Sequence, residues 1–263
     1  MPKARILKIP PQFFEPIDNE TVAGSVINQI ETLILNGILR EGVRLPSERD
    51  LSEQFSISRP KVREALQILE ERQLVRVIHG DGIYIGKLGA EAMSPALIEL
   101  YKRHPSAIFD HLEYRREQEC FAARLAAVRS TKTDRALINN LLDAMKNAHN
   151  KGNHKLGDEL DTKFHNAVVS ASHNRILIHM MSSLYELNRS AVFFSRREIL
   201  NIAEVSEFLL DQHHAIGEAI CSSQTDKAVK AAGDHIDYVI LSTQEALSER
   251  ERETIAAKRV VVV

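Results

Sequence analysis

The sequence predicts a mainly α-helical protein with two domains: an N-terminal winged helix-turn-helix and, after it, an all-α helical bundle. Two observations carry this prediction. Residues 21–86 change from helical to alternating periodicity and end in an Asp-Gly turn between two β-rich runs. Residues beyond 106 are almost continuously helix-like, which is typical of a bundle. The expected division is a flexible arm at 1–20, the winged domain at 21–86, a linker at 87–105, a helical domain at 106–249 and a frayed tail at 250–263.

The composition is that of a folded protein rather than a disordered or uniformly basic one. Hydrophobic residues make up 44% of the 263 positions, charged residues 27%, and the formal net charge is -2. Any contact with nucleic acid must therefore come from a local basic patch. Cys120 and Cys221 form no CxxC pair, so we expect no disulfide framework and a reducing cytoplasm. No apolar run reaches membrane-spanning length, so we expect a soluble protein without a membrane partner.

Three helices are expected in the first domain. Apolar residues recur at helical spacing from Thr21 and stop near Asn36-Gly37, where glycine favours a helix end. Ser47 is placed to cap a short second helix, with Asp50 three positions later completing a capping box. Ser58 is placed to cap the third helix, whose expected buried stripe is Val62, Ala65, Leu66 and Leu69.

A β-hairpin is expected immediately after the third helix. The segment 74–78 alternates, the turn His79-Gly80-Asp81-Gly82 follows, and the β-rich run 83–85 closes it. Three helices and a hairpin in this order predict a winged helix-turn-helix.

The second domain is expected to contain only long helices. Polar and glycine-containing breaks divide it into the segments 106–130, 133–151, 155–172, 174–194, 198–222 and 225–249.

The first turn of the expected third helix carries the basic patch that DNA binding requires. Arg59, Lys61 and Arg63 could meet guanine edges or phosphates in the major groove, with the hydroxyl of Ser58 beside them. The alternative is that these charged side chains form only a solvent-exposed face of the helix and do not bind DNA. The segment LPSERDLSEQFSISRPKVREALQILEERQLV, followed by a glycine-bounded hairpin, resembles the N-terminal domain of GntR-family regulators. The resemblance implies contacts to double-stranded operator DNA from the following residues: Arg49, Arg59 and Arg63 as leading contacts, Ser58 and Lys61 in support, and His79 and Gly80 at the wing.

Metal-ligating residue types recur in the second domain. Asp161 and His165 lie four positions apart and share a helix face, and His213 and His235 lie in two later amphipathic helices. Each could instead be a surface histidine or a satisfied core histidine. If they converge, they could hold a divalent ion and leave positions open for a ligand's oxygens. His214 is the alternative to His213.

The segments DTKFHNAVVSASHN, HHAIGEAI and AAGDHIDYV resemble the FCD domain of the FadR subfamily within the GntR family. Many members bind a metal through one Asp and three His, and the resemblance places these ligands on Asp161, His165, His213 and His235. The metal it implies is a divalent ion, with zinc the first candidate and nickel or manganese the alternatives.

A ligand-binding arginine is also implied. HLEYRREQECFAARLAAVRS resembles the FCD segment in which an arginine is followed by glutamate four positions later, here Arg115 and Glu119. A guanidinium in a bundle cavity can clamp a carboxylate with two parallel hydrogen bonds. The alternative is an ion pair on the helix surface. The chain is similar to members that sense pyruvate or lactate, which implies a small carboxylate effector.

Together these observations predict a transcriptional regulator rather than an enzyme, with no catalytic residues. We expect a repressor that binds a palindromic operator as a homodimer, with the segment 106–249 binding the effector and forming the dimer. The alternative is a metal-dependent hydrolase built on the helical domain, although no HExxH motif is present. A metal that only ties the bundle together is a further alternative.

Overall fold

The computed structural model describes residues 22–86, 100, 103–104, 107–189 and 203–261. The expected arm at 1–20 and nearly all of the expected linker at 87–105 lie outside these residues. The chain divides into two compact units, Met1–Ala90 and Glu91–Val263. Within the described ranges, no helix has the length and apolar content that crossing a membrane requires.

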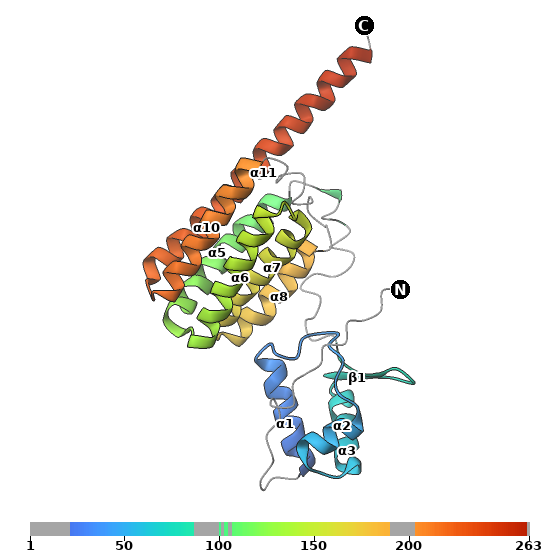
Figure 1. Ribbon diagram of the computed structural model, residues 1–263. Coiled ribbons are helices and arrows are strands. Elements are labelled where there is room, and N and C mark those ends of the chain that lie inside the picture. Colours follow the sequence, from blue (N-terminus) through green and yellow to red (C-terminus); the bar gives the residue numbers. More distant parts are fainter. Residues whose placement is uncertain (1–21, 87–99, 101–102, 105–106, 190–202, 262–263) are drawn as a thin grey trace. The chain divides into compact units, whose positions relative to one another are not determined.

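The N-terminal unit is a winged helix-turn-helix, as predicted (Figure 1). One apolar core joins its helices to the inner side of the hairpin. Its most deeply buried members are Val26, Ile30, Leu51, Val62, Ala65 and Leu69. The elements are α1 (Val22–Leu35), α2 (Glu48–Phe55), α3 (Arg59–Glu71), β1 (Val75–Ile78) and β2 (Gly82–Ile85).

Local hydrogen bonds explain where α2 and α3 begin. The Ser47 hydroxyl accepts from the backbone N–H of Asp50, and the Asp50 carboxylate accepts from the Ser47 backbone, which completes the predicted capping box. Ser58 is the N-cap residue of α3, but its hydroxyl makes no capping hydrogen bond. Pro60 is tolerated in the first turn, where its missing N–H has no helical partner to lose.

The wing is an antiparallel hairpin in which Val75 lies opposite Ile85. Its turn depends on Gly80 (φ 78°) and Gly82 (φ 147°), backbone conformations that glycine adopts without strain. Arg44 supports the hairpin from outside the strands. Its guanidinium donates to the Asp81 carbonyl and its carbon Cζ lies 6.0 Å from the centre of the Tyr84 ring, while the Tyr84 hydroxyl donates to Asp81 Oδ2 at 2.8 Å.

The second unit is all-helical, as predicted, and α5 is its central helix. Helix α5 contacts α7, α8, α10 and α11, and α6 covers α7 and α10 (Figure 1). Buried Ala122, Ala123, Ala126 and Ala127 permit close approach to α5. The helices are α5 (Ala107–Arg129), α6 (Lys132–Asn150), α7 (His154–Ala171), α8 (Arg175–Arg189), α10 (Ala203–Cys221) and α11 (Thr225–Val261).

The expected helix end at residue 249 is wrong, because α11 continues to Val261. The segment assigned to a frayed tail contains no glycine or proline, and its Glu, Arg and Ala residues are strong helix formers. Nothing in the local sequence therefore ends the helix at that point.

Candidate functional site

The predicted basic residues lie on the exposed side of α2 and α3. Arg59 and Arg63 are four positions apart and therefore share one face of α3. Both side chains are exposed, as is Lys61 in the same turn. Arg49 is exposed on α2. The structure thus presents four cations and the Ser58 hydroxyl to solvent from two consecutive helices.

Three of these cations already contact glutamates. Lys61 Nζ lies 2.8 Å from Glu64 Oε2, and Arg49 Nε lies 3.0 Å from an oxygen of Glu53. Arg63 donates two hydrogen bonds to Glu48. Exposed pairs of this kind contribute about 0–1 kcal/mol each, so DNA phosphates or base edges can compete for the cations.

The wing tip carries the other two predicted contacts. His79 and Gly80 lie in the turn between β1 and β2 and are exposed. Arg44 was not predicted from the sequence to take part in the wing. Its hydrogen bond to Asp81 and its position over Tyr84 fix the base of this turn. An arginine that precedes a helix cap carries no local signal of contact with a hairpin about forty residues later, so only the tertiary structure shows it.

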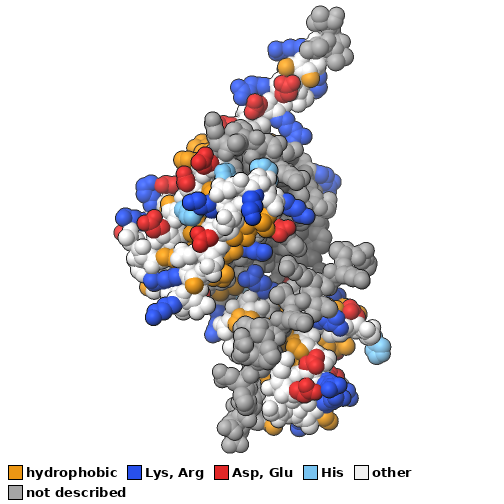
Figure 2. Space-filling view, in the orientation of Figure 1, with side chains coloured by type: hydrophobic (Ala, Val, Ile, Leu, Met, Phe, Trp, Pro, Cys, Tyr) orange, Lys and Arg blue, Asp and Glu red, His pale blue; other side chains and the backbone are white. Residues whose placement is uncertain are grey.

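The helical unit shows no comparable basic face in the visible view. Figure 2 shows Lys and Arg side chains interspersed with Asp and Glu over the described part of this unit. Its candidate site is instead buried in the bundle.

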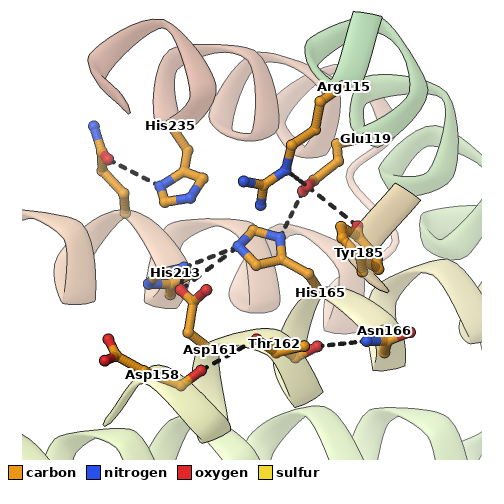
Figure 3. A network of polar contacts seen from close by, with 11 residues as sticks. Arg115, Glu119, Asp158, Asp161, Thr162, His165, Asn166, Tyr185, His213 and His235 are labelled. Carbon is orange, nitrogen blue, oxygen red and sulfur yellow. Dashed lines mark hydrogen bonds and ion pairs between the residues drawn. The ribbon is translucent and has the colours of Figure 1, made fainter. Parts of the chain in front are cut away.

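The three predicted histidine ligands meet inside the bundle. His165 on α7, His213 on α10 and His235 on α11 are 1–2% exposed, and each offers a ring nitrogen within 4.8 Å of the others' (Figure 3). Asp161, one helical turn before His165, is also buried. Its Oδ1 lies 2.9 Å from His213 Nε2 and 3.7 Å from His165 Nε2.

Two side-chain oxygens orient two of the three imidazoles. His165 Nδ1 lies 2.5 Å from Glu119 Oε2, and His235 Nδ1 lies 3.1 Å from Gln212 Oε1. Because each acceptor takes a proton from Nδ1, the lone pair of Nε2 is presented to the centre of the cluster. Three imidazoles and one carboxylate are a donor set that suits zinc and related divalent ions. The residues present therefore fit a metal.

Arg115 lies beside the cluster and is buried. The side chains of Arg115 and Glu119 are 11% and 5% exposed, and Arg115 Nε donates to Glu119 Oε1 at 2.6 Å. The surface ion pair considered as an alternative is therefore wrong. The Arg115 guanidinium also lies over the Tyr185 ring, with Cζ 5.6 Å from the ring centre.

Burial and charge act in opposite directions on this group. Burial alone would raise the pKa of Glu119, but the nearby Arg115 and His165 outweigh it and hold that pKa well below the ordinary value. Burial, followed by the Glu119 carboxylate, raises the pKa of Tyr185 well above its usual value. Glu119 is therefore an anion and Tyr185 a neutral hydroxyl near neutral pH.

The structure distinguishes His213 from His214 and adds two residues that were not predicted from the sequence. His213 is 1% exposed and in the cluster, whereas neighbouring His214 is half-buried and outside it. The hydroxyl of Tyr185, near the end of α8, donates to Glu119 Oε1, and Oε1 of Gln212, adjacent to His213, contacts His235 Nδ1. Both are single polar residues in amphipathic helices, and no spacing rule distinguishes them from surface positions.

Comparison with known proteins agrees with both halves of this description. The model of bacterial regulatory proteins of the gntR family matches residues 22–85, and the FCD domain model matches residues 110–238. The Glc operon transcriptional activator of Escherichia coli (strain K12) is 32% identical over 81% of this chain and 85% of its own length. The chain belongs to the GntR family.

Further relatives of this GntR-family protein are regulators as well. The putative L-lactate dehydrogenase operon regulatory protein of Escherichia coli (strain K12) is 29% identical, over 83% of this chain and 84% of its own. The solved structure of Streptococcus agalactiae GntR is 25% identical with a TM-score of 0.52, covering 83% of this chain and 98% of that one.

The family assignment establishes a DNA-binding transcriptional regulator with a GntR domain and an FCD domain. The hydrolase alternative is wrong, because the relatives are regulators rather than enzymes.

Proposed function

We propose that this regulator binds a divalent metal through Asp161, His165, His213 and His235 and senses a small carboxylate at that metal. The observation that supports this proposal most directly is that three buried imidazoles from three helices converge, with Arg115 beside them. Burying so many polar groups is costly unless they are paired or hold an ion. The metal, once bound, supplies positive charge that attracts carboxylate oxygens.

Arg115 supplies the second recognition element. Its Nε is held by Glu119, and the same guanidinium carries four further N–H donors that can meet a carboxylate. A short 2-oxo or 2-hydroxy acid matches a metal and an arginine together, because its carboxylate and adjacent oxygen lie close enough to contact both. The relative named for the L-lactate dehydrogenase operon supports pyruvate or lactate as the effector.

At the other end of the chain, we propose that Arg49, Arg59 and Arg63 make the leading operator contacts, with Ser58 and Lys61 in support and His79 and Gly80 at the wing. The exposed positions of these residues on α2, α3 and the turn support the assignment. The protein acts as a homodimer in the cytoplasm, because a two-fold protein matches a palindromic operator and doubles the number of contacts.

The effector must bind the DNA-competent and DNA-incompetent states with different affinity, or it shifts nothing. We propose repression that the carboxylate relieves. The relatives include both activators and repressors of transcription: one is named an activator, and another, NanR of Salmonella arizonae, is named a repressor. Operator occupancy measured with and without effector therefore gives the direction.

The test is a thermal-shift titration of zinc-loaded protein with pyruvate and with lactate. Stabilisation of the wild type that is lost in Arg115→Ala supports the proposal. Arg124→Ala is the matched control, because Arg124 lies on the same helix but is exposed. If neither acid stabilises the loaded wild type, or if Arg115→Ala responds equally, the sensing assignment fails. Nickel and manganese are tested in parallel for the metal's identity.

The same experiment distinguishes a sensing metal from one that only stabilises the helical bundle. The latter would raise the melting temperature of the protein, but carboxylates would then change neither stability nor operator occupancy. Both readouts must respond for the sensing role to stand.

A further inference from the structure

The carboxylate of Glu119 lies at the junction between the histidine cluster and Arg115. Its Oε2 is 2.5 Å from His165 Nδ1, and its Oε1 accepts from Arg115 Nε at 2.6 Å and from the Tyr185 hydroxyl at 3.1 Å. Figure 3 shows these contacts converging from α5, α7 and α8. The Glu119 side chain is 5% exposed, so these donors replace its hydration.

Each of these contacts fixes one feature of the site. A carboxylate only accepts hydrogen bonds, so His165 must carry its proton on Nδ1 and present Nε2 to the cluster. The same carboxylate fixes the Nε edge of Arg115, whose guanidinium lies between Glu119 and His235 in Figure 3. The Tyr185 hydroxyl shares Oε1 with Arg115, and the Tyr185 ring lies against the guanidinium.

We infer that Glu119 is a positioning residue that orients the His165 imidazole for metal and the Arg115 guanidinium for the effector at the same time. This inference rests on the proposed function and goes beyond it, because it assigns the connection between metal and effector to one side chain. Glu119 itself touches neither. A loss of Glu119 therefore weakens the metal site and the carboxylate clamp together.

Glutamine at this position cannot do the same. It offers one acceptor oxygen and one amide donor, whereas His165 Nδ1, Arg115 Nε and the Tyr185 hydroxyl are all donors toward Glu119. Either His165 or Arg115 must then face the N–H of the amide and turn away. Glu119→Gln therefore preserves the volume of the side chain and removes both its negative charge and its function as a double acceptor.

The first experiment measures the affinity of Zn²⁺ alone by competition with a chelator, with no carboxylate present. Removal of a partner that orients a metal-bound histidine costs about 10–100-fold in metal affinity, and we expect this loss for Glu119→Gln. Glu117→Gln is the matched control. Glu117 lies two positions before Glu119, is exposed and pairs with Arg116, so this substitution also removes one negative charge, but outside the site.

The second experiment measures pyruvate binding to variants saturated with Zn²⁺, where differences in metal affinity no longer contribute. We expect Glu119→Gln to weaken pyruvate binding and Arg115→Ala to add little further loss in that background. Full additivity of the two substitutions would show that Glu119 does not position Arg115 and would overturn that half of the inference.

A third measurement keeps the inference testable if Glu119→Gln does not fold. The ring ¹⁵N shifts of His165 in the metal-free wild type report its tautomer, with His165→Gln identifying the signals. Protonated Nδ1 supports the inference, whereas protonated Nε2 overturns it. A wild type that binds no Zn²⁺ would defeat the proposed function itself. Unchanged Zn²⁺ affinity in folded Glu119→Gln would defeat only the role of Glu119.

Discussion

The guanidinium of Arg63 on α3 donates two hydrogen bonds to the carboxylate of Glu48 on α2, from Nε to Oε1 at 3.1 Å and from Nη2 to Oε2 at 2.6 Å. This pairing joins the two helices of the helix-turn-helix through a residue proposed to contact DNA. A bidentate pair fixes the plane of the guanidinium, which a single contact does not. Glu48 therefore restricts the directions in which Arg63 can meet the major groove.

Replacing Glu48 by Gln should reduce the preference for operator over random DNA. The substitution removes one negative charge, which holds the plane of Arg63 and, in the proposed complex, repels the DNA phosphates. A bidentate arginine contact discriminates between bases by about 1–3 kcal/mol, so we expect roughly tenfold loss of preference, mostly through tighter binding to random DNA. Gel shifts with both duplexes at one salt concentration measure it. An unchanged ratio would exclude this positioning role.

The same pair predicts a pH dependence. The hydrogen bond from Arg63 is the largest cause that holds the pKa of Glu48 below its ordinary value. A carboxyl with a depressed folded pKa stabilises the fold above its unfolded pKa, about 4.3, and this contribution is lost as pH falls through the folded pKa. A carboxyl ¹³C titration should show a low midpoint for Glu48 that Arg63→Ala raises. A midpoint that does not move in Arg63→Ala would contradict the assigned cause.

Arg59→Ala or Arg63→Ala should abolish operator binding at physiological salt while the N-terminal unit stays folded. Both side chains are exposed and neither belongs to the apolar core. If the lost contact is to a phosphate, the slope of log K against log salt falls by about 0.9. Arg72→Ala is the control, because Arg72 caps the opposite end of α3 and pairs with Glu31. Wild-type affinity in either of the first two variants would refute their assignment.

His213→Ala and His214→Ala should differ sharply in metal binding. His213 is 1% exposed and contributes to the cluster, whereas His214 is half-buried and outside it. Loss of one of four proposed ligands should abolish stoichiometric Zn²⁺ binding, while the neighbouring substitution leaves it intact. Zinc content after dialysis measures both. Retention of zinc by His213→Ala would exclude this residue as a ligand.

Alanine substitutions at two glycines should have opposite effects on the free energy of unfolding. A Cβ at Gly217 on α10 would lie 2.5 Å from Leu142 Cδ1 and 3.2 Å from Ile138 Cγ2 on α6, so Gly217→Ala should destabilise the bundle by about 1–3 kcal/mol through overpacking. A Cβ at Gly157 on α7 meets nothing within 4 Å. Gly157→Ala should stabilise by about 0.5–1 kcal/mol, because glycine is a poor helix residue. Urea unfolding of both variants compares the signs directly, and destabilisation by Gly157→Ala would contradict this account.

The sequence by itself determined the winged helix-turn-helix and the all-helical second domain. The period of the apolar residues, the capping box at Ser47 and the N-cap position of Ser58 are local properties that a chain displays before it folds. The Asp-Gly turn of the wing is another such property. The end of α11 was predicted wrongly because the sequence contains no stop signal there, and only the folded helix defines its length.

The tertiary structure decided which of these residues meet. It brought three histidines from α7, α10 and α11 together in one cluster, which includes His213 and excludes His214. It also buried Arg115 with Glu119. It also added Tyr185 and Gln212, residues without any motif. Contacts between helices far apart in the sequence depend on how apolar faces pack, and a helical period gives the face of a residue without naming its partner.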